Sequence, residues 1–186
     1  MTRKADEANR SQLLERIVAY VMSNGVASLS LRPLGKELGV SPALLLYHFG
    51  SKEELTVEVL RYAGDRQREL IASMHLRENA TVHEICREAW RVVSAPAVRP
   101  LFRVFFEVYG LALIDPQRFP GFFPGAVANW LVFLEQAYVR GGMSRGDARV
   151  RATFVLAVFR GFLLDLCATG DTKRLRRAVD LWIGEL

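Results

Sequence analysis

Three closely spaced helix starts between Ser28 and Leu55 constrain the fold of this chain more than any other feature. Ser30, Ser41 and Ser51 can each cap a helix, because serine hydroxyls accept hydrogen bonds from the first free amides. Gly39 separates the first two helices with a residue that readily adopts the left-handed conformation. Two short helices joined by a glycine-containing turn predict a helix-turn-helix, whose second helix enters the major groove of DNA.

Two further features mark these helix starts. Pro42 follows Ser41 at the first helical position, where a missing amide hydrogen costs nothing. Glu54 stands three residues after Ser51, which is the spacing of a capping box. Five apolar residues have the spacing to pack the three short helices together, so we expect them to be buried. They are Leu34, Leu38, Val40, Leu45 and Phe49.

The rest of the chain shows helical periodicity and no convincing strand pattern. Apolar residues recur at helical spacing between breaks rich in glycine or proline, which predicts an all-α fold of about nine helices. We expect an N-terminal three-helix helix-turn-helix domain, residues 1–52, and a C-terminal helical domain, residues 53–186. The helix that starts after Ser51 would join them. Residues 115–125 are rich in proline, glycine and phenylalanine and are expected to form a loop.

The composition fits a small protein of a reducing compartment. The chain has 186 residues, 51% of them hydrophobic, enough for one large or two small domains. Cys86 and Cys167 match no metal-ligand spacing, so we expect reduced thiols, no metal, no cofactor and a cytoplasmic location. The N-terminus is polar and has no apolar segment, so we expect no signal peptide there. No apolar run reaches the length of a bilayer, the longest being broken by Arg160, so we expect no membrane partner.

The net charge of +5 suits a polyanionic partner. Residues 1–52 contain seven Lys or Arg and four Asp or Glu, and the chain then becomes acidic through Glu53, Glu54 and Glu58. The charge therefore permits nucleic-acid binding without establishing it.

The motif LGVSPALLLYHFGSKEEL resembles the tetracycline-repressor-like (TetR) family of transcriptional regulators. The resemblance is close from Ala8 to Val59, and the spelling LLYHFGSKE is similar to an actinobacterial branch of the family. It rests on Leu38-Gly39-Val40-Ser41, on His48-Phe49 and on Ser51-Lys52-Glu53 with Leu55. The resemblance implies a homodimer that binds a pseudo-palindromic operator in double-stranded DNA. It also implies release from the operator when a small-molecule effector binds the C-terminal domain.

The candidate DNA-binding residues lie in and around the second helix of the motif. They are Arg32, Ser41, Pro42, Ala43, Leu44, Leu46, Tyr47, His48 and Lys52. By the resemblance Tyr47 and His48 touch phosphates, to which a phenol and an imidazole can both donate. Lys52 stands at a helix N-terminus, where the helix dipole favours an anion. The alternatives are a packed turn histidine for His48 and a solvated lysine for Lys52.

A basic N-terminal arm is a second candidate contact with DNA. Arg3, Lys4 and Arg10 precede or open the first helix and could reach phosphate or the minor groove. A disordered polar terminus explains the same residues equally well.

The expected recognition helix is unusually apolar. Family members usually carry a tyrosine two residues before the histidine, where this chain has Leu46. The helix lacks Asn, Gln and Arg, so Ala43, Leu44 and Leu46 offer only apolar contacts, chiefly to thymine methyl groups. Hydrogen-bonded readout would come from Ser41, from Arg32 or through water. We therefore predict a T-rich half-site with modest discrimination.

The C-terminal domain carries many large aromatic residues, most of them expected in its core. Phe119, Phe122 and Phe123 fall in the predicted loop, and one explanation is a lid over an apolar cavity. Ligand sites are mostly apolar pockets between helices, so we expect a hydrophobic or aromatic effector of modest polarity. The candidate pocket residues are Trp90, Phe102, Phe106, Tyr109, Phe122, Trp130 and Phe159. Four polar residues near apolar faces would pair with one another or orient a ligand: His83, Glu107, Arg160 and Asp165.

The last two helices have the pattern of a dimer interface. Ala157 and Gly161 are four residues apart on one helix face, where small residues let a partner helix approach closely. Two such helices from each of two chains would form a four-helix bundle, although the same face could also pack within one monomer. The candidate interface residues are Phe154, Ala157, Val158, Gly161, Phe162, Val179 and Trp182.

Other function classes find little support in the sequence. There is no Ser/His/acid set with a supporting nucleophile elbow, no glycine-rich phosphate loop and no HExxH, so we expect no enzyme. His83, Glu84 and Cys86 are close in sequence, but adjacent helical positions point to different sides. The apolar recognition helix keeps one alternative open, a helical small-molecule-binding protein that has lost specific DNA binding.

Overall fold

The computed structural model describes residues 2–119 and 121–186, and this part of the chain contains helices and no strand. The prediction of an all-α fold is confirmed. The α-helices are α1 (Thr2–Asn24), α2 (Leu31–Leu38), α3 (Pro42–Phe49), α4 (Lys52–Ala72), α5 (Val82–Val93), α6 (Arg99–Ile114), α7 (Asn129–Arg140), α8 (Arg145–Thr169) and α9 (Thr172–Gly184). Short helical turns lie at Pro96–Val98, Pro116–Arg118 and Pro124–Ala128, the last of them a π turn that leads into α7.

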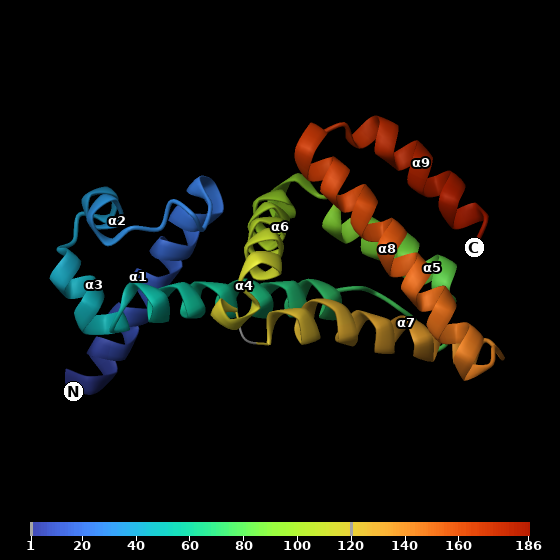
Figure 1. Ribbon diagram of the computed structural model, residues 1–186, viewed down its shortest axis with the longest axis horizontal. Helices are drawn as coiled ribbons and strands as arrows, with labels where there is room; N and C mark the ends of the chain where they lie inside the picture. Colours follow the sequence, from blue (N-terminus) through green and yellow to red (C-terminus); the bar gives the residue numbers. More distant parts are fainter. Residues whose placement is uncertain (1, 120) are drawn as a thin grey trace.

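The helices form an elongated molecule with the helix-turn-helix at one end (Figure 1). Helices α1, α2 and α3 gather at that end, and α5, α8 and α9 gather at the other. Helix α4 starts beside α3, crosses α6 and reaches α5. One helix therefore passes from the DNA-binding motif into the C-terminal domain, as the sequence predicts.

The N-terminal helices pack through the residues that the sequence indicates. Leu34, Leu38, Leu45 and Phe49 are buried in one core cluster, and Val40 packs against it. Buried residues of α1, α4 and α6 belong to the same cluster. The packing prediction is confirmed, and the core extends beyond the three short helices into α6.

Two of the three predicted serine caps form. The Ser41 hydroxyl accepts a hydrogen bond from the Leu44 amide at 3.1 Å. Ser51 and Glu54 make the capping box, with distances of 2.7 Å from the Ser51 amide to Glu54 and 3.1 Å from the Glu54 amide to the Ser51 hydroxyl. Ser30 stands in the N-cap position of α2 with extended backbone, but its side chain makes no cap hydrogen bond, which corrects that expectation.

The turn of the helix-turn-helix needs two glycines for different reasons. Gly39 has φ of 67°, in the left-handed region where glycine carries no steric penalty. Gly35 lies where a Cβ atom would be 2.7 Å from the Val40 carbonyl oxygen. The Val40 amide in turn donates to the Gly35 carbonyl at 2.9 Å, so α2 and the turn are in direct backbone contact.

The C-terminal core contains buried residues from all five helices α5 through α9. Helix α6 contributes to this core and also to the N-terminal one. Phe102 of α6 lies in the C-terminal cluster, whereas Val104, Val108 and Ala112 of the same helix lie in the N-terminal one. The predicted loop 115–125 differs from expectation in two ways. It contains helical turns, and Phe119 is buried in the N-terminal core, with Phe122 and Phe123 packed against it.

Helix α8 is apolar on more than one face. By length and composition alone it could cross a membrane, which corrects the expectation that no segment reaches that length. In the folded chain one face is buried against α6, α7 and α9. The opposite face leaves Val150, Phe154 and Leu164 exposed.

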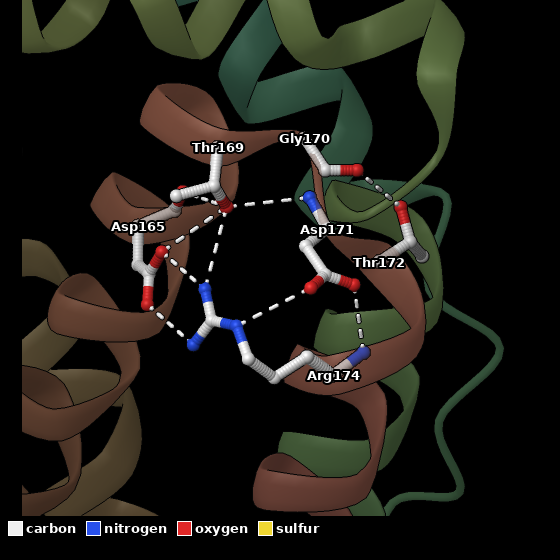
Figure 2. Close-up of polar contacts among 6 residues, drawn as sticks. All are labelled: Asp165, Thr169, Gly170, Asp171, Thr172 and Arg174. Atoms are coloured by element: carbon white, nitrogen blue, oxygen red, sulfur yellow. Dashed lines mark hydrogen bonds and ion pairs between the residues drawn. The ribbon is translucent and has the colours of Figure 1, made fainter.

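Polar contacts fix the corner between α8 and α9 (Figure 2). The Arg174 guanidinium donates to both carboxylate oxygens of Asp165, at 3.0 and 2.7 Å, and lies 3.4 Å from Asp171. These hydrogen bonds from Arg174 are the main reason that the pKa of Asp165 lies below its ordinary value. Asp171 caps α9 by accepting from the Arg174 amide at 3.0 Å.

Candidate nucleic-acid interface and effector cavity

The outer face of α3 is exposed and mostly apolar. Pro42 and Ala43 are exposed, as are Leu44 at 39%, Leu46 at 42% and Tyr47 at 72%. Contiguous exposed apolar patches can mark interaction sites, whereas single exposed apolar residues need no explanation. Arg32 of α2 is exposed as well, so the predicted DNA-binding residues of both helices are accessible.

His48 is half-buried at the end of this face. Its ring lies 5.0 Å from that of Tyr47, edge to face. Its backbone carbonyl accepts a hydrogen bond from Arg10 Nε at 3.1 Å. The structure thus places Tyr47 and His48 side by side and fixes the backbone of His48 against α1.

Arg10 has a structural role that replaces the predicted one. Its guanidinium lies 5.0 Å from the centre of the Phe49 ring and forms an ion pair with Glu58. These contacts tie α1 to α3 and α4, so Arg10 is not part of a free arm. The side chains of Arg3 and Lys4, the other two arm residues, lie outside the described residues.

Lys52 is the first residue of α4 and is half-buried. It follows Ser51, whose capping box with Glu54 fixes the start of the helix. A phosphate placed here would meet the positive end of a helix of 21 residues and the lysine charge together.

A cavity of about 630 Å³ lies between α4, α6 and the segment that leads into α7. Helix α4 contributes Leu60, Ala63, Gly64 and Gln67 to its wall. The aromatic part of the lining is Phe102, Phe105, Phe119, Phe122, Trp130 and Phe133. A smaller space of about 40 Å³ adjoins it and shares Gln67, Phe102, Phe105 and Trp130.

The predicted pocket residues do not all meet in this cavity. Phe102, Phe122 and Trp130 line it, and Phe159 lines the adjoining space. Trp90 is buried against Phe159 and Phe162. Tyr109 packs edge to face on Phe122 and Phe123. Phe106 faces a separate hollow of about 300 Å³ with Met22 and Glu107.

The sequence reasoning missed the wall that α4 supplies. Leu60, Ala63, Gly64 and Gln67 recur at three- and four-residue spacing, so they share one helix face. Ala63 and Gly64, the small residues in the middle of that face, leave space between α4 and its neighbours. Their position on this face was the signal in the sequence that pointed to a cavity there. Phe105 was also missed, although it lines both spaces.

The four polar residues near apolar faces do not pair with one another. His83 is exposed, and Asp165 binds Arg174. Arg160 donates to the Ala126 carbonyl and lies 5.7 Å from the centre of the Tyr109 ring. Glu107 of α6 accepts hydrogen bonds from the backbone amides of Val26 at 2.8 Å and Ala27 at 2.6 Å.

The predicted interface residues divide into two groups. Phe154 is 55% exposed, and Ala157 and Gly161 are exposed beside it, while Val158 and Phe162 are half-buried. Val179 and Trp182 are instead buried in the core of the chain itself, because their face of α9 turns toward α5 and α8. Leu181 of α9 is 67% exposed.

The described residues contain no group of three or more His, Cys, Asp or Glu side chains placed to hold a metal ion. His83 is exposed, Glu84 closes a capping box with Thr81, and Cys86 is buried, so these neighbours in sequence point apart. Burial raises the pKa of the Cys86 thiol to about 12.

Known proteins resemble the chain in both sequence and fold. A sequence model described as bacterial regulatory proteins, tetR family, matches residues 13–59. The transcriptional regulator BetI of Rhizobium meliloti is 26% identical over 175 residues, which cover 91% of this chain and 71% of that protein. The transcriptional repressor AcnR of Corynebacterium diphtheriae is 25% identical over 180 residues, covering 92% of this chain and 88% of that protein.

A crystal structure shows the same fold over nearly the whole length. It is a transcriptional regulator from Saccharomonospora viridis in complex with choline, 20% identical, with a TM-score of 0.79 and 96% of each chain covered. The exposed recognition helix and the helical domain behind it define a DNA-binding transcriptional regulator. Over residues 13–59 the chain matches the tetR family of bacterial regulatory proteins, and both relatives are transcriptional regulators.

Proposed function

We propose that this regulator is a homodimeric cytoplasmic repressor, without catalytic activity, that leaves its operator when an apolar or aromatic effector enters the cavity. The observation that carries the proposal is the course of α4. This helix begins at Lys52 beside the recognition helix and lines the cavity with Leu60, Gly64 and Gln67. A ligand that changes the position of α4 changes the position of α3 with it.

The DNA-binding surface consists of the residues that the sequence indicates. Tyr47, His48 and Lys52 contact phosphates, which position the protein without reading sequence. Ala43, Leu44 and Leu46 contact thymine methyl groups, because no amide or guanidinium of α3 competes with them. Pro42 lies against the DNA backbone, and Ser41 and Arg32 supply the hydrogen-bonded part of the readout.

Release is a shift between two conformations, one of which holds the recognition helices at operator spacing. A ligand shifts this equilibrium only by the difference in its affinity for the two states. A tenfold loss of operator affinity requires about 1.4 kcal/mol of coupling. Helix α6 supports such coupling, because it lines the cavity and also carries Glu107, which binds the turn after α1.

The outer face of α8 is the proposed dimer contact. Val150, Phe154, Ala157, Gly161 and Leu164 alternate at four- and three-residue spacing, which places them along one stripe. All five are exposed in the single chain. Two such stripes would pack together, and the two recognition helices would then meet two half-sites of a pseudo-palindromic operator.

The test is unbiased selection of DNA. The purified protein is mixed with fragmented genomic DNA of its source, and the retained fragments are sequenced. We expect a few sharp peaks that share an inverted repeat with T-rich half-sites. A strong preference for G·C pairs beyond the reach of Arg32 would contradict the apolar readout.

One alternative function rests on a specific observation. Because α3 presents apolar residues and no Asn, Gln or Arg, the chain could be a small-molecule-binding protein that has lost specific DNA binding. Absence of any enriched fragment at low salt would favour this alternative, since phosphate contacts alone bind DNA strongly under that condition.

A further inference from the structure

The charged groups around the effector cavity are all of one sign. Arg61 and Arg68 of α4 and Arg118 line the main cavity, and Arg160 of α8 lines the adjoining space. Among the described residues, no Asp or Glu lines either space. Low-dielectric walls with charges of one sign raise the local concentration of ions of the opposite sign.

The three arginines at the mouth are accessible to solvent. Arg68 is 67% exposed and pairs with Asp65 one turn away. Arg118 is exposed and stacks near Phe119, 5.6 Å from the ring centre, and Arg61 is exposed on α4. Screening keeps the energy of such exposed charges small, so they draw anions toward the mouth more than they hold them.

Arg160 differs from these three because it is half-buried and lacks an acidic partner. It donates to the Ala126 carbonyl and lies over the Tyr109 ring. A guanidinium has five N–H donors, so these contacts leave most of them without an acceptor from the described residues. Burial lowers the pKa of Arg160 below its ordinary value, as it does for a cation removed from water without a counter-charge.

We infer that the effector is an organic anion, with an apolar or aromatic body in the main cavity and a carboxylate or similar group bound by Arg160. This inference rests on the proposed function, since it names the chemical class of the ligand for the same cavity. A planar carboxylate matches the fork of the guanidinium and forms two parallel hydrogen bonds. The aromatic lining and the cavity of about 630 Å³ accommodate a polycyclic body.

The inference is tested with three probes that share one body and differ in charge. Pyrenebutanoate is an anion, pyrenebutanol is neutral and pyrenebutylammonium is a cation. Each is titrated into the full-length protein, and binding is measured by energy transfer from tryptophan, because Trp130 lines the cavity. We expect the anion to bind about tenfold more tightly than the alcohol, the factor that one charged hydrogen-bonded contact supplies.

Substitutions at Arg160 assign the preference to one side chain. Arg160→Gln should reduce the affinity for the anion to that for the alcohol and leave the alcohol unchanged. Arg160→Lys keeps the charge but loses the fork of the guanidinium, so it should keep only part of the preference. Arg149→Gln is the matched control, because it removes one positive charge from an exposed position of the same helix, outside the lining of both spaces.

The outcomes separate the charge inference from the function on which it rests. If the alcohol and the ammonium bind as well as the anion, the cavity is a ligand site but the inference about charge is wrong. If Arg160→Gln weakens all three probes equally while circular dichroism shows a folded protein, Arg160 only shapes the cavity, which also overturns the inference. If no probe binds the wild-type protein, both the inference and the proposed effector cavity are contradicted.

Discussion

At the scale of single residues, the DNA-binding motif depends on close backbone contact as much as on side chains. Gly35 is buried in α2, and its missing Cβ is what allows the Val40 carbonyl to approach. That contact fixes α2 against the turn that leads to α3, and the angle between the two helices would decide how α3 meets DNA. A change of one methyl group therefore acts on function through geometry.

Gly35→Ala should destabilise the protein and weaken operator binding. Forcing a methyl group into a packed site costs about 1–3 kcal/mol. Urea unfolding measures the loss of stability, and fluorescence anisotropy with the selected operator measures the loss of affinity. Gly110→Ala is the control, since a Cβ there meets nothing within 4 Å. Equal stability of the two variants would mean that the backbone of the turn adjusts without cost.

Lys52→Ala should weaken binding to all DNA sequences alike. Removing one phosphate contact lowers the slope of log affinity against log salt by about 1 and leaves the sequence preference unchanged. Lys173→Ala in α9 is the control, because it removes the same charge from a helix outside the helix-turn-helix. An unchanged slope for Lys52→Ala would identify Lys52 as an ordinary surface lysine.

Cys86 should make stability fall at high pH. Its thiol has a pKa of about 12 in the folded chain, and an unfolded thiol has a pKa of about 8.5. The unfolded state therefore loses its proton first, and the free energy of unfolding falls between these values by at most about 1.4 kcal/mol per pH unit. Below the lower value the contribution of the neutral thiol is fully present.

The measurement is urea unfolding at several pH values from neutral to alkaline. Because Cys86→Ala loses packing at every pH, the comparison uses the slope of the free energy of unfolding against pH and not its absolute value. The slope of the wild-type protein above the lower pKa should exceed that of Cys86→Ala. Parallel curves would show that the thiol ionises in the folded state as easily as in the unfolded one.

At the scale of elements, local signals predicted most helices and long-range packing decided the rest. The caps at Ser41 and Ser51 fix α3 and α4 within a few residues, because they depend on neighbours in sequence. The placement of Phe119 in the N-terminal core depends on α6, which is distant in the chain. The burial of Val179 and Trp182 likewise depends on α5 and α8, which periodicity along α9 cannot specify.

The candidate sites follow the same division. The proposed DNA-binding surface lies within residues 32–52, and the structure leaves its predicted residues at least partly accessible. The cavity combines α4, α6 and α7, and aromatic content alone pointed to Phe102, Phe122 and Trp130 but not to Leu60 or Gln67. The charge of Arg10 suggested a phosphate contact. In the structure its guanidinium instead forms an ion pair with Glu58 and donates to the His48 carbonyl.

Glu107→Ala should remove the hydrogen bonds that connect α6 to the turn after α1. The amides of Val26 and Ala27 would lose their acceptor, at a cost of about 1–3 kcal/mol for the partly buried Val26 amide and less for the exposed Ala27 amide. Urea unfolding and amide hydrogen exchange at these two residues measure the effect. Glu78→Ala, at an exposed position, is the control. Unchanged protection of both amides would show that the carboxylate does not hold the turn.

Helix α4 should transmit the effect of a ligand in the cavity to the recognition helix α3. Inserting one glycine near Ala63-Gly64 rotates the part that lines the cavity relative to the part that starts at Lys52. We expect operator binding to persist while the response to a bound ligand is lost. The measurement is operator affinity with and without pyrenebutanoate, and an unchanged response would rule out this role of α4.

At the scale of the whole molecule, the apolar outer face of α8 explains two observations together. It makes the helix apolar enough, by length and composition alone, to cross a membrane, and it leaves Phe154 and Leu164 exposed on a folded chain. A second copy of the same stripe would cover these residues. The same contact would fix the distance between two recognition helices, so assembly and DNA binding would depend on one surface.

Gly161→Arg tests that dependence with little risk to the fold. A Cβ at Gly161 meets nothing within 4 Å in the single chain, so a side chain there conflicts only with a partner. We expect the wild-type protein to sediment at twice the chain mass of 21.0 kDa and the variant to sediment as a monomer. Since each monomer holds one half-site, the variant should also lose most of its operator affinity.

Ile114→Asp is the control for an added charge on an exposed apolar residue, because Ile114 is 83% exposed at the end of α6, away from the stripe. It should remain a dimer and bind the operator normally. A Gly161→Arg protein that stays dimeric would place the interface elsewhere. A variant that is monomeric yet binds the inverted repeat with wild-type affinity would show that the two half-sites are read independently, and the link between assembly and DNA recognition would be wrong.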